Sequence, residues 1–258
     1  MAAFTEEHVD VNGIDTAVFT AGEGDPLVFL TGAGTAPGFD GLLPLAEQFK
    51  LILPHHSGFG SSADDTSITR IEDYVLHYLD LFDALGLDEV SIVGHSIGAT
   101  IGAWLAIYDG RRVRRLVLAA PYGLRVPEHP TIDFFSLNDD EIAGYLANDM
   151  SVYSHYPNPM TPEFLALLYR EGTSFARIGW ERNYDLKLHR WLHRLTMPTL
   201  LLWGTGDRLI PSDQASVWAE LIPDAEVRTV PGAGHLLFNE SQEAVSAVAD
   251  FVGAEVAV

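Results

Sequence analysis

The 258-residue chain contains no cysteine. Disulfide bonds, thiolate metal sites and thiol nucleophiles are therefore excluded. Lysine is also scarce, since Lys50 and Lys187 are the only lysines among the 15 basic residues. The chain has 36 acidic residues. The formal net charge of −21 disfavours binding to nucleic-acid phosphates and to anionic membrane surfaces. We therefore expect neither nucleic acid nor a membrane as a partner.

Long apolar runs and a targeting sequence are absent as well. No stretch reaches the ~18 apolar residues of a membrane span. Residues 1–10 have neither the basic start nor the apolar run of a secretory signal. The contents of 47% hydrophobic and 20% charged residues are typical of a globular chain and not of a disordered one. These features predict a soluble, cytoplasmic protein.

Short apolar runs alternate with helical patterns along most of the chain. Because the apolar runs are uninterrupted, they favour a parallel sheet that is covered on both faces. Asn12-Gly13 between the first two runs predicts a hairpin turn. The expected strands are 7–11, 14–19, 27–30, 51–53, 90–93, 116–119, 199–203 and 227–230. The expected helices between them are 68–85, 97–108, 212–221 and 244–252.

One region, residues 121–195, breaks this alternation. It has no strand-like run, is rich in proline and aromatic residues, and has helical patterns at 141–150, 162–171 and 185–195. We interpret it as an all-helical insertion between two sheet strands. The prediction is therefore an α/β core made of residues 1–120 and 196–258, interrupted by a helical insertion at 121–195.

A G-x-S-x-G motif carries the strongest chemical signal. It reads Gly94-His95-Ser96-Ile97-Gly98, follows an apolar strand and opens a helix. This strand–turn–helix setting is the one that exposes a nucleophilic serine at a sharp turn. Gly94 and Gly98 are expected where a Cβ would clash with neighbouring backbone. Ser96 is the predicted nucleophile, and the Ile97 N–H at the helix start is a predicted oxyanion donor.

A serine nucleophile needs a base and a carboxylate that orients the base. His235 lies in a glycine-rich loop, Pro-Gly-Ala-Gly-His, after the last expected strand. Asp207 lies in the loop Gly-Thr-Gly-Asp that follows another strand, and Asp213 is its rival. Both loops sit at carboxyl ends of strands, where α/β sheets place their sites. We predict Ser96, His235 and Asp207 as a catalytic triad.

These three segments resemble the α/β-hydrolase family. The matching pieces are GHSIG, WGTGDRLIP and GAGHLLFNE, and the resemblance spans nearly the whole chain. It implies the α/β-hydrolase fold, with a mostly parallel central sheet of about eight strands and helices on both faces. It also implies that the helical insertion at 121–195 is the family's cap, with some of its many aromatic residues lining an apolar pocket over Ser96.

The resemblance also implies where the second oxyanion donor lies. In the same part of the chain, the sequence departs from the family pattern at two places. The donor comes from the loop after the third strand, which makes the Ala33 N–H the candidate beside Ile97. Thr31 stands where the family usually has histidine. His55 and His56 follow the fourth strand where the family commonly has aspartate, and we expect them to support the loop there.

Two other patterns resemble a metal site and a cofactor site but are incomplete, so we expect no metal and no cofactor. His189 and His193 have the spacing of a zinc-binding helix pair, but Arg190 stands where a metalloprotease needs glutamate. Gly32 and Gly34 follow a strand, but the third glycine of a dinucleotide-binding loop is out of register.

The main functional hypothesis is a serine hydrolase that cleaves a small or medium apolar ester through an acyl-enzyme. Alternatives on the same triad are a carbon–carbon bond hydrolase and a lactonase. Carbon–carbon hydrolases of this fold typically carry Trp after the catalytic His and an Arg in the cap. Here Leu236 follows His235, while Arg177 and Arg182 are available. A third alternative, from another class, is a small-molecule receptor with a residual triad. The oligomeric state, a homodimer included, stays open.

Overall fold

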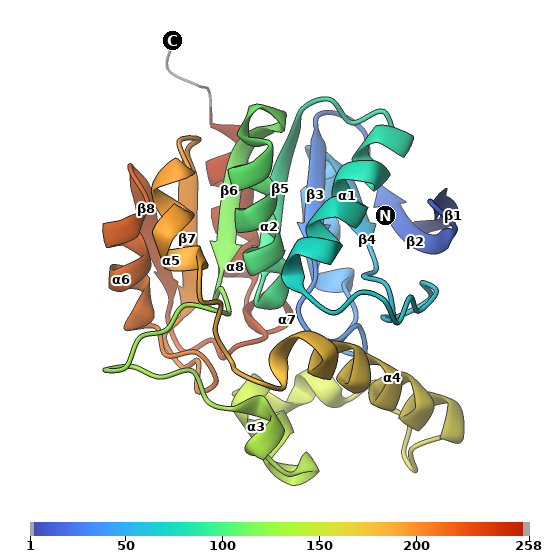
Figure 1. The fold of residues 1–258 in the computed structure, drawn as a ribbon. Helices are drawn as coiled ribbons and strands as arrows, with labels where there is room; N and C mark the ends of the chain where they lie inside the picture. The colour runs from blue at the N-terminus through green and yellow to red at the C-terminus, as the bar shows by residue number, and fades with distance from the viewer. Residues whose placement is uncertain (1–2, 255–258) are drawn as a thin grey trace.

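One β-sheet forms the middle layer of the protein. In residues 3–254, which this computed structural model describes, the sheet has eight strands in the order β1-β2-β4-β3-β5-β6-β7-β8 (Figure 1). β2 pairs antiparallel with β1 and β4, and the other neighbouring pairs are parallel. The strands are Thr5–Val11 (β1), Ile14–Ala21 (β2), Pro26–Leu30 (β3), Lys50–Pro54 (β4), Val90–His95 (β5), Val113–Ala119 (β6), Thr199–Gly204 (β7) and Ala225–Val230 (β8). The predicted fold class, a mostly parallel sheet of about eight strands, is confirmed.

The hairpin between β1 and β2 follows from its two turn residues. Asn12 and Gly13 have φ angles of 53° and 88°. A two-residue turn of this kind needs positive φ at both positions, which Asn and Gly tolerate best. The Gly13 N–H also donates to Oδ1 of Asp10 at 2.9 Å.

Helices cover both faces of the sheet. One face is covered by α1 (Ile71–Ala84), α2 (Ile97–Tyr108) and α6 (Gln214–Leu221). The other is covered by the 3-10 helix η1 (Asp40–Glu47) and by α8 (Gln242–Gly253). Figure 1 shows α1 and α2 in front of the sheet and α8 behind it. Two short helices complete the core, η2 (Gly110–Arg112) and α7 (Leu237–Glu240).

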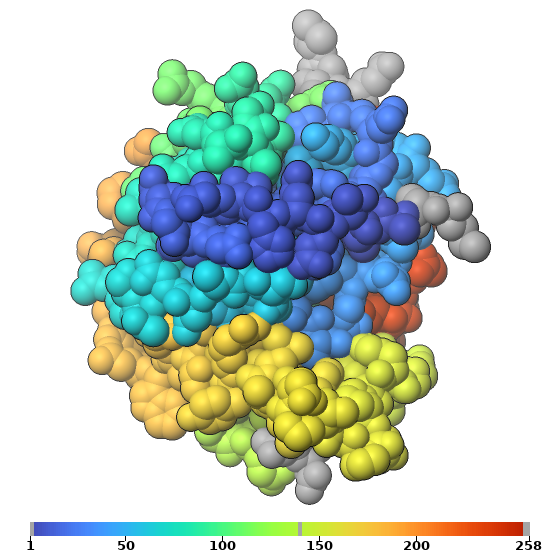
Figure 2. Space-filling model, turned by 90° about the vertical axis from the view of Figure 1, so that its right-hand side faces the viewer, coloured from blue at the N-terminus to red at the C-terminus, as the bar shows by residue number. Residues whose placement is uncertain are grey.

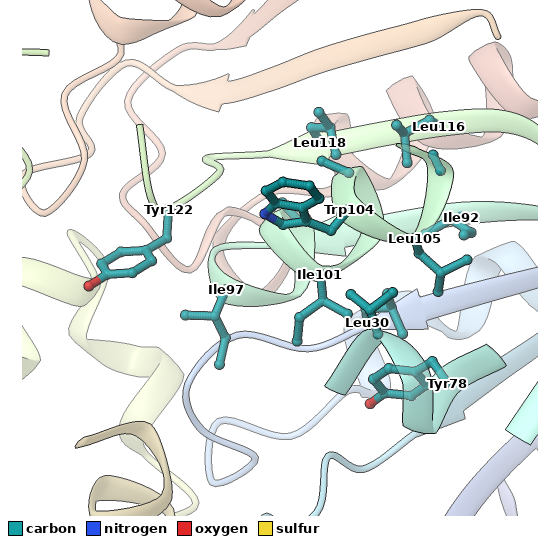
Figure 3. Close-up of a cluster of buried hydrophobic side chains, with 14 of the residues drawn as sticks. Leu30, Tyr78, Ile92, Ile97, Ile101, Trp104, Leu105, Leu116, Leu118 and Tyr122 are labelled. Atoms are coloured by element: carbon teal, nitrogen blue, oxygen red, sulfur yellow. The ribbon is translucent and has the colours of Figure 1, made fainter. Parts of the chain in front are cut away.

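Alternation along the strands builds a separate apolar layer on each face. In β3, Val28 and Leu30 belong to the layer under α1 and α2, whereas Leu27 and Phe29 belong to the layer under η1 and α8. α2 is buried along all of its length except Tyr108. Figure 3 shows its side chains among those of β3, β5 and β6. A helix that is apolar all round is stable only when neighbours enclose it.

Residues 121–195 connect β6 to β7. Their helices are η3 (Phe134–Ser136), α3 (Asp139–Leu146), η4 (Met150–Tyr153), α4 (Pro162–Gly179), α5 (Leu188–Trp191) and η5 (Leu192–Arg194). Figure 1 shows α3 and α4 beyond the carboxyl ends of the parallel strands, whereas α5 lies in front of the sheet beside β7. We call residues 121–195 the cap from here on. Its division from the core at 121 and 195 stays a prediction, and the outer limits at 1 and 258 lie outside the described residues.

Two predicted helices begin later than expected, each for a local reason. α1 begins at Ile71 and not at 68, because the Asp73 carboxylate accepts the N–H groups of Thr69 and Arg70 and caps the helix there. Residues 185–195 hold two short helices and not one. The Asp185 carboxylate accepts the N–H of Lys187 and of Leu188, which delays the helix start.

The two main cap helices also differ from their predicted extents. The first ends at Leu146 and not at 150, because Ala147 adopts an extended conformation. α4 runs on to Gly179, eight residues beyond the predicted end at 171. Ser174 and Phe175, in this extra part, are buried against the rest of the protein. Tertiary packing therefore stabilises turns that the sequence pattern left out.

Among residues 3–254, no helix is both long enough and apolar enough to cross a membrane.

The enclosed position of α2 predicts a strong stability effect at Ile101. Its side chain is fully buried between α2 and its neighbours (Figure 3). Ile101→Ala should lower the free energy of unfolding by about 2–5 kcal/mol, because it removes buried methyl groups and leaves a cavity. Leu76→Ala, at a side chain that is 58% exposed on α1, should change it by less than about 0.5 kcal/mol. Urea denaturation of both variants checks this, and equal losses would contradict it.

Candidate active site

Ser96 occupies a strained turn between β5 and α2. β5 ends at His95, α2 begins at Ile97, and Ser96 has φ 54° and ψ −119°. A non-glycine residue rarely adopts this conformation, and it persists only where surrounding contacts enforce it. The Ser96 N–H donates to the Ala119 carbonyl at 2.9 Å, and the Ser96 carbonyl accepts from the Tyr122 N–H at 3.2 Å. Both bonds tie the turn to β6 and to the start of the cap.

The two glycines of the motif lie where backbones touch. A Cβ on Gly94 would lie 2.4 Å from the Cα of Ala99 in α2. A Cβ on Gly98 would lie 2.2 Å from the Leu30 carbonyl oxygen at the end of β3. No real Cβ makes such contacts, so a side chain at either position would push α2 away from the sheet.

His235 and Asp207 lie together in the loops that follow β8 and β7. Nδ1 of His235 and Oδ2 of Asp207 are 2.8 Å apart, and both side chains are almost completely buried. The other Asp207 oxygen, Oδ1, accepts the N–H groups of Leu209 (2.9 Å) and Ile210 (2.8 Å). The carboxylate therefore holds the imidazole with Nδ1 as donor, and Nε2 is left with its lone pair.

His95 connects this pair to the serine turn. Its Nε2 donates to the backbone carbonyl of His235 at 2.8 Å, and the two rings lie 4.8 Å apart. Since Ser96 follows His95 directly, this bond holds the His235 loop against the turn. Burial lowers the pKa of His95 to about 3, with a smaller effect of His235. His95 therefore stays neutral near pH 7. The sequence reasoning missed this role.

The loop after β3 passes directly over the serine. A Cβ on Gly32 would lie 3.3 Å from the Ser96 Cβ, which places Ala33 beside the turn. The N–H groups of Ala33 and Ile97 have no backbone acceptor within residues 3–254. Two unpaired N–H groups beside a serine are the arrangement that an oxyanion hole requires.

His56 holds the first residue of this loop. Its Nε2 donates to the Thr31 carbonyl at 2.8 Å, and its Nδ1 accepts from the Tyr78 hydroxyl. His55 lies beside it, and its Nδ1 accepts the Ser61 N–H at 3.1 Å. Both histidines support loops, as their positions in the sequence indicated.

The remaining candidates lie elsewhere. Asp213, the rival carboxylate, is on the surface, 4.0 Å from Nδ1 of His129. His189 lies on α5 and His193 on η5. Across the described part of the chain, no three or more histidine, aspartate or glutamate side chains are grouped so as to hold a metal ion.

This geometry agrees with comparisons to known proteins. The sequence profile of the alpha/beta hydrolase family matches residues 27–248. The chain belongs to the alpha/beta hydrolase family.

Relatives of this hydrolase act on several substrates. It is 26% identical over 260 residues to a 2-hydroxy-6-oxo-6-(2'-aminophenyl)hexa-2,4-dienoic acid hydrolase of Metapseudomonas resinovorans, covering 94% of this chain and 88% of that one. It is 27% identical over 274 residues to a 2-hydroxy-6-oxo-2,4-heptadienoate hydrolase of Pseudomonas putida, covering 94% of each. A solved bacterial membrane phospholipase A shares the fold at a TM-score of 0.85 and 19% identity, covering 97% of this chain and 86% of that one.

The cap of this hydrolase is bonded to the loops that carry His235 and Asp207. The Asn148 side chain donates to the carbonyls of Gly206 (3.1 Å) and Gly232 (3.0 Å), one in each loop. Glu240, at the end of α7, accepts the N–H groups of Asn148 (3.2 Å) and Gly234 (3.1 Å). Glu240 ends the GAGHLLFNE segment, but its contact with the cap could not be predicted from it, and no sequence motif marks Asn148.

An aromatic cluster continues from the serine turn into the cap. Tyr122, which donates to the Ser96 carbonyl, has its ring 5.6 Å from that of Phe175 in α4. Phe134 and Phe135 add rings 5.7 and 5.1 Å from Phe175. Figure 3 shows Tyr122 set apart from the side chains around α2. These four rings thus link the start of the cap to α4.

The buried histidines predict a loss of stability in mild acid. Burial is the main cause that lowers the pKa of His55 and His56 to about 4. Below the unfolded value of about 6.5, the unfolded chain binds protons that the folded chain excludes. The free energy of unfolding should therefore fall as pH drops from about 6.5 to about 4, by about 1.4 kcal/mol per pH unit for each such histidine.

Urea denaturation between pH 7 and 5 measures this slope. His56→Gln removes one of the groups and should reduce the slope by about 1.4 kcal/mol per pH unit below pH 6. An unchanged slope in this variant would contradict the assignment.

Proposed function

We propose that this hydrolase uses Ser96 as nucleophile, His235 as general base and acid, and Asp207 as the carboxylate that orients His235. One observation carries the proposal. A buried hydrogen bond of 2.8 Å joins Asp207 to His235, and His95 holds the His235 backbone against the strained turn that carries Ser96. The N–H groups of Ala33 and Ile97 are the proposed oxyanion hole. Gly94 and Gly98 are proposed to be required for the turn.

We further propose that the bond cleaved joins two carbon atoms, in a small conjugated 6-oxo-dienoate. Support comes from the two dienoate hydrolases, which this chain resembles over 94% of its length. The apolar cluster of Tyr122 and Phe175 next to Ser96 suits the substituent of such a ketone.

The reaction proceeds in two halves. Ser96 Oγ attacks the ketone carbon while its proton passes to Nε2 of His235. The bond to the neighbouring carbon then breaks. For its electron pair to be delocalised, the 2-hydroxyl proton of the substrate must first move to that carbon, which gives the 2-oxo tautomer. The electron pair then passes along the chain to the 2-oxo oxygen, and this oxygen takes the proton from His235. Water then gives a proton to His235 and attacks the acyl-enzyme, and the proton returns to Ser96 Oγ as the acid leaves. The sum is one ketone plus one water to one acid and one enol.

An apolar carboxylic ester is the second candidate substrate, and two observations favour it. Leu236 follows His235, where carbon–carbon hydrolases of this fold typically carry Trp. Of the cap arginines, Arg177 is paired with Asp64 and Arg182 with Glu181. Both guanidinium groups therefore already have a carboxylate partner. A lactone would also be attacked by Ser96 and released by hydrolysis of the acyl-enzyme. A receptor, by contrast, would bind its ligand without turnover.

Removing the nucleophile should abolish turnover. Ser96→Ala should lower kcat by about 10⁴–10⁶-fold, because the acyl-enzyme can no longer form. Ser216→Ala, at an exposed serine of α6, is the matched control and should keep full activity. Retention of most activity by Ser96→Ala would exclude Ser96 as the nucleophile.

A direct comparison of substrates decides between the two bond types. We expect kcat/KM for 2-hydroxy-6-oxohepta-2,4-dienoate, followed by loss of its absorbance, to exceed that for the best p-nitrophenyl ester from acetate to decanoate by about 100-fold. The reverse order would assign an esterase. Single labelling of Ser96 by a fluorophosphonate, with no turnover of esters, dienoates or lactones, would favour a receptor.

A further inference from the structure

A buried carboxylate of the cap contacts the loop that carries Ala33. Glu171, in α4, is only 2% exposed. Its Oε2 accepts the Thr35 N–H at 3.1 Å, and its Oε1 accepts both the Thr35 hydroxyl and the Gly60 N–H, the latter at 2.9 Å. Glu171 therefore joins the cap to two core loops, one after β3 and one after β4.

Glu171 lies on the face of α4 that docks on the core. Arg170 donates to the Gly60 carbonyl, Ser174 Oγ donates to the Gly58 carbonyl at 3.4 Å, and Arg177 pairs with Asp64. These positions recur every three or four residues, as one face of a helix requires. Figure 2 shows the segment of the cap that includes α4 packed directly below the loop after β4.

The carboxylate of Glu171 is surrounded by hydrogen-bond donors. A buried carboxylate is costly unless donors surround it. Within residues 3–254 Glu171 forms no ion pair, so its charge is met by N–H and hydroxyl groups. Two of these three donors belong to Thr35, two residues beyond Ala33. The contact thus acts on the loop next to the serine.

The loop is held at two points. His56 holds the Thr31 carbonyl, and Glu171 holds Thr35. Between them lie only Gly32, Ala33 and Gly34, and glycines restrict the backbone least. The direction of the Ala33 N–H is therefore set by the two ends of the segment. One end is held by the core and the other by the cap.

We propose that Glu171 is a positioning residue for the oxyanion hole, so that the hole is complete only while α4 is docked. This rests on the proposed function, in which the Ala33 N–H stabilises the oxyanion. The cap then does more than cover the substrate. It also completes the catalytic centre, because displacement of the cap would misplace the Ala33 N–H donor as well as uncover the substrate.

The test uses three variants of α4 and its partner. Glu171→Gln keeps the shape but turns an amide NH₂ toward one of the donors. Glu171→Ala removes all three bonds, and Thr35→Val removes only the hydroxyl contact. Glu163→Gln, at an exposed position in the first turn of the same helix, is the matched control. Two readouts apply: kcat and KM for the turned-over substrate, and the rate at which a fluorophosphonate labels Ser96.

We expect Glu171→Gln to lower kcat by about 10–100-fold with KM changed less than about threefold, because a misplaced donor affects the transition state more than the bound substrate. The labelling rate should fall by a similar factor, since the phosphoryl oxygen uses the same donors. Glu171→Ala should lower kcat and the labelling rate more than Glu171→Gln does, and Thr35→Val should lower them less. Glu163→Gln should leave both unchanged. Where Glu171→Ala does not fold, the other two variants carry the test.

The outcomes separate this inference from the proposed function. Equal kcat and equal labelling rates in folded Glu171→Gln and wild-type protein, with only a lower Tm, would overturn the positioning role and leave the triad standing. A raised KM with unchanged kcat would also overturn it, because that result assigns Glu171 to substrate binding. A wild-type protein whose Ser96 does not react with the fluorophosphonate would overturn both proposals.

Discussion

The close approach of three backbones at residues 94–98 is the constraint on which the rest of the site depends. β5 turns into α2 within one residue, and α2 touches the end of β3. Only glycine fits at positions 94 and 98, and Ser96 takes up the strain of the turn. The enclosed, apolar α2 secures this geometry, because moving it would expose a helix with no polar face (Figure 3).

The parallel sheet brings the other groups to this point. β5 lies between β3 and β6, and β7 and β8 follow on the same side. Because all five run in one direction, their carboxyl ends share one edge, where the loops of Ala33, Asp207 and His235 begin. Direct bonds then refine the positions. His95 fixes the backbone of His235, and Asp207 fixes its ring.

The cap braces the site from two sides. Asn148 and Glu240 join it to the loops after β7 and β8, and Glu171 joins it to the loops after β3 and β4. Apart from Gly60, the core residues bound in this way lie within a few positions of a group proposed to act in catalysis. Hydrogen bonds therefore join the cap to the loops that carry the proposed catalytic groups, and the aromatic cluster around Phe175 adds apolar contact between the cap and the serine turn.

Much of the fold and the chemical groups could be predicted from the sequence. Apolar runs located the strands, the 97–108 helix was placed correctly, and Ser96, Asp207 and His235 lie in loops that local glycine patterns reveal. Such features depend on neighbours in the chain, which a single sequence displays. The contacts of His95, Asn148 and Glu171, the extra turns of α4 and the pairing of Arg177 with Asp64 could not be predicted. They join residues up to 140 positions apart, and only tertiary packing brings these together.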